Sequence, residues 1–245
     1  MLTRHQLLRW YRTDPTQRVA TPSRRWVRLG KNPSFFPATK LVLNGTVGSF
    51  LSTPSNAAVN AALSAPAAWE GRALVSATWT SAITEGVFNI MDVGSANCSL
   101  RLYRAAARAV FGQIVKPGGT FGGQNGQHPV FVNGSEHWLR MTWDPSTSTL
   151  NIYYSDDGVA WNLIVGGAVA GFTAVNVSTQ PLRVGGEGTG AMVALIGYVK
   201  RFEFRSPIGG AILAGFDASQ AKIGDTTCAG LNGETWTING GASFQ

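Results

Sequence analysis

The stretch of residues 137–163, HWLRMTWDPSTSTLNIYYSDDGVAWNL, constrains the fold more than any other part of the chain. Its first part, residues 138–143, alternates between two sets of side chains, which is the period-two pattern of a half-buried strand. An Asp-Pro pair ends this strand, because proline has no N–H for a β ladder, and a second alternating run follows at 150–154. The Asp-Gly pair at 157–158 can form a tight hairpin before the chain returns. The stretch therefore predicts three consecutive antiparallel strands.

Short alternating runs continue along most of the chain, and they predict about a dozen strands in two packed antiparallel sheets. Residues 116–128, KPGGTFGGQNGQH, hold five glycines and are expected to form a surface loop. A helical turn or a loop is expected at 55–63. The other strands are expected at 41–54, 72–80, 86–93, 99–104, 109–114, 130–132, 181–184, 192–204 and near Trp236, the last returning beside the first.

The chain of 245 residues, with 30 glycines and 11 prolines, fits one large β domain preceded by an arm. We place the arm at residues 1–40 and the domain at 41–245. No run of 18 apolar residues occurs, and arginines interrupt the first residues, so neither a membrane span nor a signal peptide is expected.

The arm carries most of the positive charge. Residues 1–40 contain nine basic residues and one acidic residue, whereas the whole chain has a net charge of +7. Such a segment contacts something acidic or is a solvated basic tail. Large aromatic residues alternate with the arginines, as in protein interfaces, so we expect docking on a protein surface and no nucleic acid partner. The expected docking residues are Arg9, Trp10, Tyr11, Arg24, Arg25, Trp26, Arg28, Phe35 and Phe36.

The sequence contains no pattern that indicates a catalytic residue, a metal ligand or a cofactor site. Glycoside hydrolysis needs two carboxylates facing each other, and each acidic residue stands alone in its predicted strand. Asp156 and Asp157 are adjacent in a hairpin turn, where they are expected to shape the turn. His128 and His137 flank residues 131–136, yet no serine or cysteine there stands in a nucleophile-elbow context. The sequence therefore predicts a protein that is not an enzyme, and it nominates no calcium site.

The chain has two cysteines, Cys98 and Cys228, which lie 130 positions apart. No second thiol or histidine stands at metal-ligand spacing from either of them. We expect thiols, and a single long-range disulfide remains the alternative.

Three segments resemble one known family. They are the WLR strand with its SDDGVAW hairpin, the segment LVLNGTVGSFLSTP at 41–54, and AGFD at 214–217 followed by GETWTING at 233–240. Together they resemble the concanavalin A-like (laminin G-like) jelly roll, in the version found in minor tail and other virion proteins of tailed phages of actinobacteria. The resemblance covers residues 40–245, and its motifs concern architecture more than activity.

This resemblance implies an all-β, two-sheet antiparallel jelly-roll sandwich behind the basic arm. It further implies a virion structural protein, a minor tail protein whose arm docks on the particle and whose jelly roll faces outward. The expected partners are other virion proteins, further copies of the chain and a host cell-surface glycan, with no membrane. The expected location is the virion, assembled in the host cytoplasm. A capsid decoration protein and, in another class, a secreted carbohydrate-binding module are the alternatives, and the missing carboxylate pair argues against a glycoside hydrolase.

Exposed aromatic rings on a jelly-roll surface provide apolar faces for sugar rings. The alternative for every such ring is packing against a neighbouring strand. The carbohydrate-binding candidates are Trp69, Tyr103, Trp138 and Tyr153.

Overall fold

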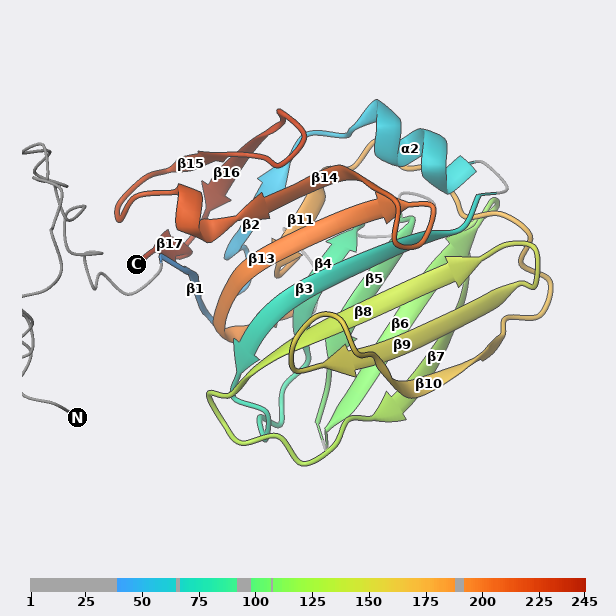
Figure 1. Ribbon diagram of the computed structural model, residues 1–245, viewed down its shortest axis with the longest axis horizontal. Coiled ribbons are helices and arrows are strands. Elements are labelled where there is room, and N and C mark those ends of the chain that lie inside the picture. The colour runs from blue at the N-terminus through green and yellow to red at the C-terminus, as the bar shows by residue number, and fades with distance from the viewer. Residues whose placement is uncertain (1–38, 65–66, 92–97, 107, 188–191) are drawn as a thin grey trace, which may run out of the picture. The chain divides into compact units, whose positions relative to one another are not determined.

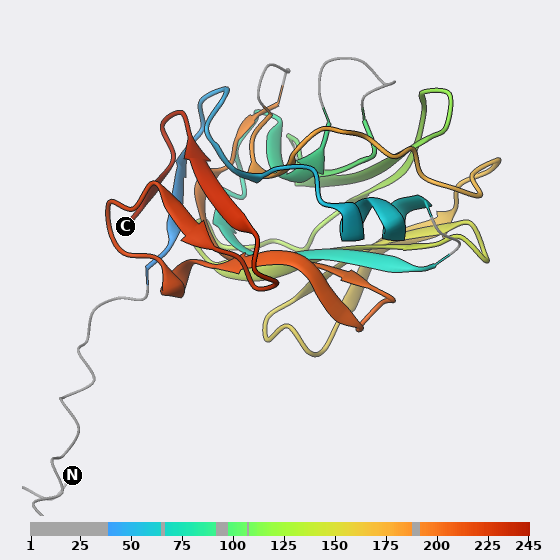
Figure 2. The same cartoon turned by 90° about the horizontal axis from the view of Figure 1, so that it is seen from above.

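The computed structural model describes residues 39–64, 67–91, 98–106, 108–187 and 192–245. The described residues from 39 to 245 form one compact unit, in which two β-sheets pack face to face (Figures 1 and 2). The prediction of an all-β, two-sheet antiparallel sandwich is confirmed. The predicted docking residues of the arm lie outside the described residues, and the boundary between the arm and the domain stays a prediction.

Sheet A has eight strands, with β14 pairing β13 beside the main path. Its order is β10 (Asn162–Ala168), β9 (Thr149–Ser155), β8 (Glu136–Asp144), β3 (Trp69–Ala77), β13 (Ile196–Ser206), β1 (Leu41–Asn44) and β17 (Ser243–Phe244), and β14 spans Ala211–Asp217.

Sheet B has nine strands, and its short β12 pairs with β4 in parallel. Its order is β15 (Thr227–Ala229), β16 (Thr235–Asn239), β2 (Phe50–Thr53), β11 (Leu182–Gly185), β4 (Glu85–Ile90), β5 (Leu100–Arg104), β6 (Ala109–Lys116) and β7 (Thr120–Gln127), and β12 spans Val193–Ala194.

Among the described residues two short helices accompany the sheets, α2 (Ala57–Ser64) and the 3-10 helix η2 (Ala218–Gln220). The Asn56 side chain accepts hydrogen bonds from the backbone N–H groups of Ala58 and Val59, which caps α2 at the place where a helical turn was predicted. No helix in the described part of the chain has the length and apolarity needed to cross a membrane.

The segment 41–54 forms two strands, β1 and β2, which belong to different sheets and do not pair with each other. β1 pairs with β13 and β17 in sheet A, whereas β2 pairs with β11 and β16 in sheet B. Gly45 and Gly48, both at positive φ, form the turn that carries the chain from one sheet to the other. The strand predicted near Trp236 is β16, and it returns beside the segment 41–54 as expected, by pairing with β2. At the chain end, Lys40 and Gln245 exchange backbone hydrogen bonds of 2.9 and 3.0 Å.

The predicted meander is present as β8, β9 and β10. Its alternation holds, because Leu139, Met141 and Trp143 are buried in the sandwich. The Asp157 carboxylate accepts hydrogen bonds of 2.8 Å from the N–H groups of both Val159 and Ala160, as expected of a turn-forming residue. These backbone hydrogen bonds lower the pKa of Asp157 below its ordinary value.

The core lies between the sheets. Its largest side chains include Trp69, Phe88, Phe202, Phe204 and Trp236, all fully buried. A smaller apolar cluster contains Cys98, whereas Cys228 belongs to the main core. No disulfide joins the two described cysteines, and burial raises the pKa of the Cys228 thiol to about 12.

Two local predictions are wrong. Residues 130–132 form no strand, although Val130 and Val132 are 80% and 75% exposed on either side of a buried phenylalanine, which keeps the alternation on which the prediction was based. Residues 120–127 form strand β7 instead of a loop. The glycines of β7 lie close to other segments, since a Cβ at Gly122 would come within 2.5 Å of Phe172 and Val169. Glycine is used here for close packing of a strand.

This packing predicts unequal effects of two alanine substitutions on stability. Gly122→Ala is expected to destabilise the protein by about 1–3 kcal/mol, the usual cost of overpacking. Gly167→Ala on β10 is the matched control, because its Cβ would meet only the Gln124 side chain, at 3.5 Å. Urea denaturation measures both. Equal stability of the two variants would contradict the packing of β7.

Candidate functional site

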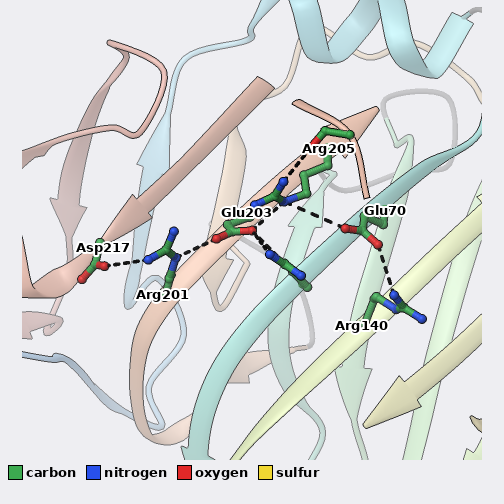
Figure 3. Close-up of polar contacts among 8 residues, drawn as sticks. Glu70, Arg140, Arg201, Glu203, Arg205 and Asp217 are labelled. Atoms are coloured by element: carbon green, nitrogen blue, oxygen red, sulfur yellow. Dashed lines mark hydrogen bonds and ion pairs between the residues drawn. The ribbon is translucent and has the colours of Figure 1, made fainter. Parts of the chain in front are cut away.

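The outward face of sheet A carries a network of charged side chains, shown in part in Figure 3. Strand alternation places these side chains there, while the intervening residues of the same strands enter the core. We call this network the arginine–glutamate ladder. Its members are Glu70, Arg72, Arg140, Arg201, Glu203, Arg205 and Asp217.

Glu203 is the centre of the ladder. Its Oε2 atom lies 2.6 Å from Nη2 of Arg72 and 2.7 Å from Nε of Arg205. Its Oε1 atom lies 2.6 Å from Nε of Arg201. Only 1% of the side chain is exposed, although it lies on the outer face, because the arginines cover it. Burial acts to raise the pKa of Glu203, but the hydrogen bonds and charges of Arg205, Arg72 and Arg201 outweigh it and lower the pKa.

The ladder continues to both sides of Glu203. Arg201 reaches Asp217 at 3.1 Å, and Arg205 lies 4.0 Å from the carboxylate of Glu70 (Figure 3). Glu70 in turn pairs with Arg140 at 3.4 Å. The guanidinium of Arg140 then lies over two aromatic rings, 4.4 Å from the centre of Tyr153 and 4.1 Å from that of Trp161.

A groove of about 280 Å³ lies beside this ladder. Trp138 of β8 is half-buried in its wall, and the Arg72 guanidinium lies 5.4 Å from the ring centre of Trp138. The hairpin after β9 packs against the same indole, since a Cβ at Gly158 would come 2.8 Å from its Nε1 atom. We call this the Trp138 groove. It is lined by Thr39, Leu74, Trp138, Lys200, Arg201, Asp217 and Ser219.

The polar side chains of the Trp138 groove are held in place by their neighbours. One oxygen of Asp217 binds Arg201, and the other accepts hydrogen bonds from the N–H and hydroxyl of Ser219 at 3.0 and 2.6 Å. Lys200 reaches Glu136 at 2.5 Å. The groove thus combines one aromatic ring with fixed cationic, carboxylate and hydroxyl groups, which suits a ligand with both C–H faces and hydroxyls.

The four predicted carbohydrate-binding residues do not form one site. The structure contradicts the surface role of Trp69, whose ring is fully buried and stacks on Phe204 with a centroid distance of 5.4 Å. Tyr103 lies on sheet B, stacked on Phe111 with a centroid distance of 5.0 Å, and burial raises its pKa. Tyr153 lies under Arg140, so of the four only Trp138 lines the groove.

Sequence analysis missed the polar residues of the groove. Arg201 of β13 pairs with Asp217 at the end of β14 on one side and with Leu74 on the other, and Leu74 pairs with Trp138. Lys200 lies at the register shift before Arg201. The AGFD motif was the available signal for Asp217, but it indicated only a strand.

Glu70 and Glu203 each stand alone in their strands, β3 and β13, but these strands are neighbours and the two carboxylates share Arg205. Both side chains are 1% exposed and paired with arginines, whereas glycoside hydrolysis needs a sugar and a water between two accessible carboxyls. We therefore assign Glu70 and Glu203 a structural role, in which they hold the arginines on the outer face of sheet A.

A serine, a histidine and an aspartate form a hydrogen-bonded chain at one end of sheet A. Ser135 Oγ lies 2.8 Å from Nε2 of His137, and Nδ1 of His137 lies 2.7 Å from Asp156. The order matches that of a serine hydrolase triad. However, the Ser135 hydroxyl donates to the carbonyl of Val132 at 2.6 Å, and its backbone N–H bonds to the same carbonyl.

This chain lacks the surroundings of a catalytic triad. The N–H of Gly134 bonds to Ala77, so neither it nor that of Ser135 is available to stabilise an oxyanion. Asp156 is 76% exposed. The three residues instead connect the loop before β8 to the hairpin after β9. Within the described residues no cluster of three or more His, Cys, Asp or Glu side chains is placed to hold a metal ion.

The sequence matches no protein-family model and no curated protein. Among solved structures, the chain is similar to a putative carbohydrate-binding protein from Bacteroides ovatus, with 11% identity and a TM-score of 0.54 over 83% of this chain and 60% of that one. It is also similar to the CBM40 domain of the Ruminococcus gnavus IT-sialidase, with 15% identity and a TM-score of 0.48 over 68% of this chain and 90% of that one. At these identities the likeness to the first of these structures shows a shared two-sheet β-sandwich fold and no more.

The ladder predicts a pH-dependent stability. The pKa of Glu203 is lower in the folded than in the unfolded protein. Ionised Glu203 therefore contributes fully to the free energy of unfolding above its ordinary pKa of 4.5, and this contribution is lost as the pH falls through the lowered pKa of the folded protein. Glu203→Gln should cost about 3 kcal/mol at pH 7 and flatten the acid limb of the stability profile. Glu136→Gln, at a half-exposed pair, should cost less than about 1 kcal/mol. Urea melts between pH 3 and 7 measure both.

The serine chain predicts no reaction with a fluorophosphonate probe, because Ser135 has no oxyanion donors beside it. Intact mass spectrometry of the treated protein measures labelling, with a known serine hydrolase in the same tube as the positive control. An adduct that disappears in Ser135→Ala would show that the three residues are a working triad.

Proposed function

We propose that this domain binds carbohydrate in the Trp138 groove and performs no catalysis on it. The observation that carries the proposal is the groove itself, in which an aromatic ring stands opposite polar groups fixed by the arginine–glutamate ladder. Aromatic rings pack against the C–H faces of sugars, while charged and hydroxyl groups orient the sugar hydroxyls. The volume of about 280 Å³ is at the low end for ligand pockets, which suits one sugar ring at the end of a glycan.

The fold likeness to a putative carbohydrate-binding protein agrees with this proposal. The sequence allowed a virion structural protein or a carbohydrate-binding module, and the fold likeness supports the carbohydrate-binding module better. The virion role keeps the support of the motif resemblance and of the basic, aromatic arm. The two roles are compatible, because a glycan-binding jelly roll on a phage particle would contact the host cell surface.

We further propose, on that resemblance, that the domain works on a virion assembled in the host cytoplasm, as a minor tail protein or a capsid decoration protein. In this proposal the arm docks on other virion proteins. A secreted binding module is the alternative. Imaging of labelled protein on intact particles distinguishes them, since a secreted module would leave the particles unlabelled.

Glycan binding predicts a specific loss in one variant. Trp138→Ala should weaken glycan binding at least about tenfold, because it removes the aromatic wall of the groove. Trp138→Phe should keep part of the affinity. A glycan array identifies the ligand, and calorimetry measures the affinity. Tyr103→Ala on sheet B is the matched control, and loss of binding in Tyr103→Ala with retention in Trp138→Ala would place the site on the other sheet.

The docking role of the arm predicts unequal effects of two changes. Trp26→Ala should abolish incorporation into particles if aromatic anchoring dominates, whereas Arg24→Gln with Arg25→Gln should weaken it only in part. Immunoblots of purified particles measure incorporation. Normal incorporation of Trp26→Ala, together with salt-sensitive binding of the arm to duplex DNA, would replace docking with contact to the genome.

A further inference from the structure

A second cavity lies away from the Trp138 groove, where the edge strand β7 of sheet B meets β9 and β10 of sheet A. Its volume is about 500 Å³, which is within the range of small-molecule sites. No acidic side chain lines it. The lining residues are Arg108, Gln127, His128, Pro129, Tyr154, Asn162, Leu163 and Ile164.

Arg108 is the cationic group of this cavity, and it lacks a partner. Among the arginines that the structure describes, it alone makes no ion pair and no hydrogen bond through its guanidinium. Its backbone is held in place, because its carbonyl accepts the N–H of His128 at 3.1 Å, and its φ is 65°. An unpaired guanidinium beside a cavity without carboxylates favours an anionic ligand.

His128 supplies a second unsatisfied group. The side chain is 1% exposed, and its ring stacks on Phe131 and meets the edge of Trp79. Nδ1 lies 2.5 Å from the carbonyl oxygen of Pro129, which can only accept, so Nδ1 carries the proton. Nε2 is then an acceptor, and it has no partner among the described residues. Burial lowers the pKa of His128, which keeps the imidazole neutral near pH 7.

The remaining walls divide into polar and apolar parts. The amides of Gln127 and Asn162 are exposed and suit vicinal hydroxyls, while Leu163 and Tyr154 offer an apolar wall. A buried acceptor that needs a donor, amides and an unpaired cation together match a ligand that carries both hydroxyls and an acid.

We propose that this cavity is a second ligand site and that it takes a sugar residue bearing an acidic group. Arg108 pairs with the acid, His128 Nε2 accepts a hydroxyl proton, and Gln127 and Asn162 bind further hydroxyls. The site is independent of the Trp138 groove, so the domain holds two sites of different charge preference.

The test compares glucuronic acid with glucose, which differ in one carboxylate, by NMR titration of the full chain. Glucuronate should shift the amide signals of Arg108, His128 and Asn162, and glucose should bind at least about tenfold more weakly. Arg108→Gln should remove the preference for the acid, and His128→Phe, which keeps a flat ring, should weaken glucuronate binding. Trp138→Ala is the matched control and should leave glucuronate binding unchanged.

Three results would overturn the proposal. One is equal binding of both sugars at this cavity, and another is full glucuronate affinity in Arg108→Gln. The third is glucuronate binding that Trp138→Ala abolishes, which assigns the acid to the groove and leaves glycan binding itself intact.

Discussion

The carboxylate of Glu203, held by Arg72, Arg201 and Arg205 on the outside of sheet A, is the interaction on which the outer face of the sheet depends. An isolated buried carboxylate is costly, whereas one with three charge-assisted hydrogen bonds is not. The carboxylate also restricts the motion of the three arginine side chains that bind it. Because each arginine also reaches a further group, one buried charge orders side chains from β8 to β14.

This order produces a binding surface. Arg201 is held between Glu203 and Asp217, and Arg72 lies over Trp138, so both walls of the groove are positioned before a ligand arrives. Preorganised polar groups cost little entropy on binding. No such network orders the cavity at the sheet edge. There ring packing holds His128, and the Arg108 guanidinium and Nε2 of His128 remain unpaired.

The meander at 137–163 was predictable because its alternation, its Asp-Pro stop and its Asp-Gly turn act over a few residues and agree with one another. Strand β7 could not be predicted in this way, because Gly122 packs against Phe172 and Val169, which are about 50 residues away in sequence. For the same reason Trp138 was found as a candidate while its groove partners Lys200 and Asp217 were missed. The prediction that Trp69 lies on the surface is wrong, because alternation does not say which face of a strand is buried when both faces carry apolar residues.

The most direct test is to map where a glycan touches the folded domain, by NMR titration with a neutral oligosaccharide selected on an array. The expected shifts gather at the indole N–H of Trp138 and at the amides of Lys200, Arg201 and Ser219, around the groove beside the ladder. Shifts confined to sheet B around Tyr103, or no shifts at millimolar sugar, would contradict carbohydrate binding on the outer face of sheet A.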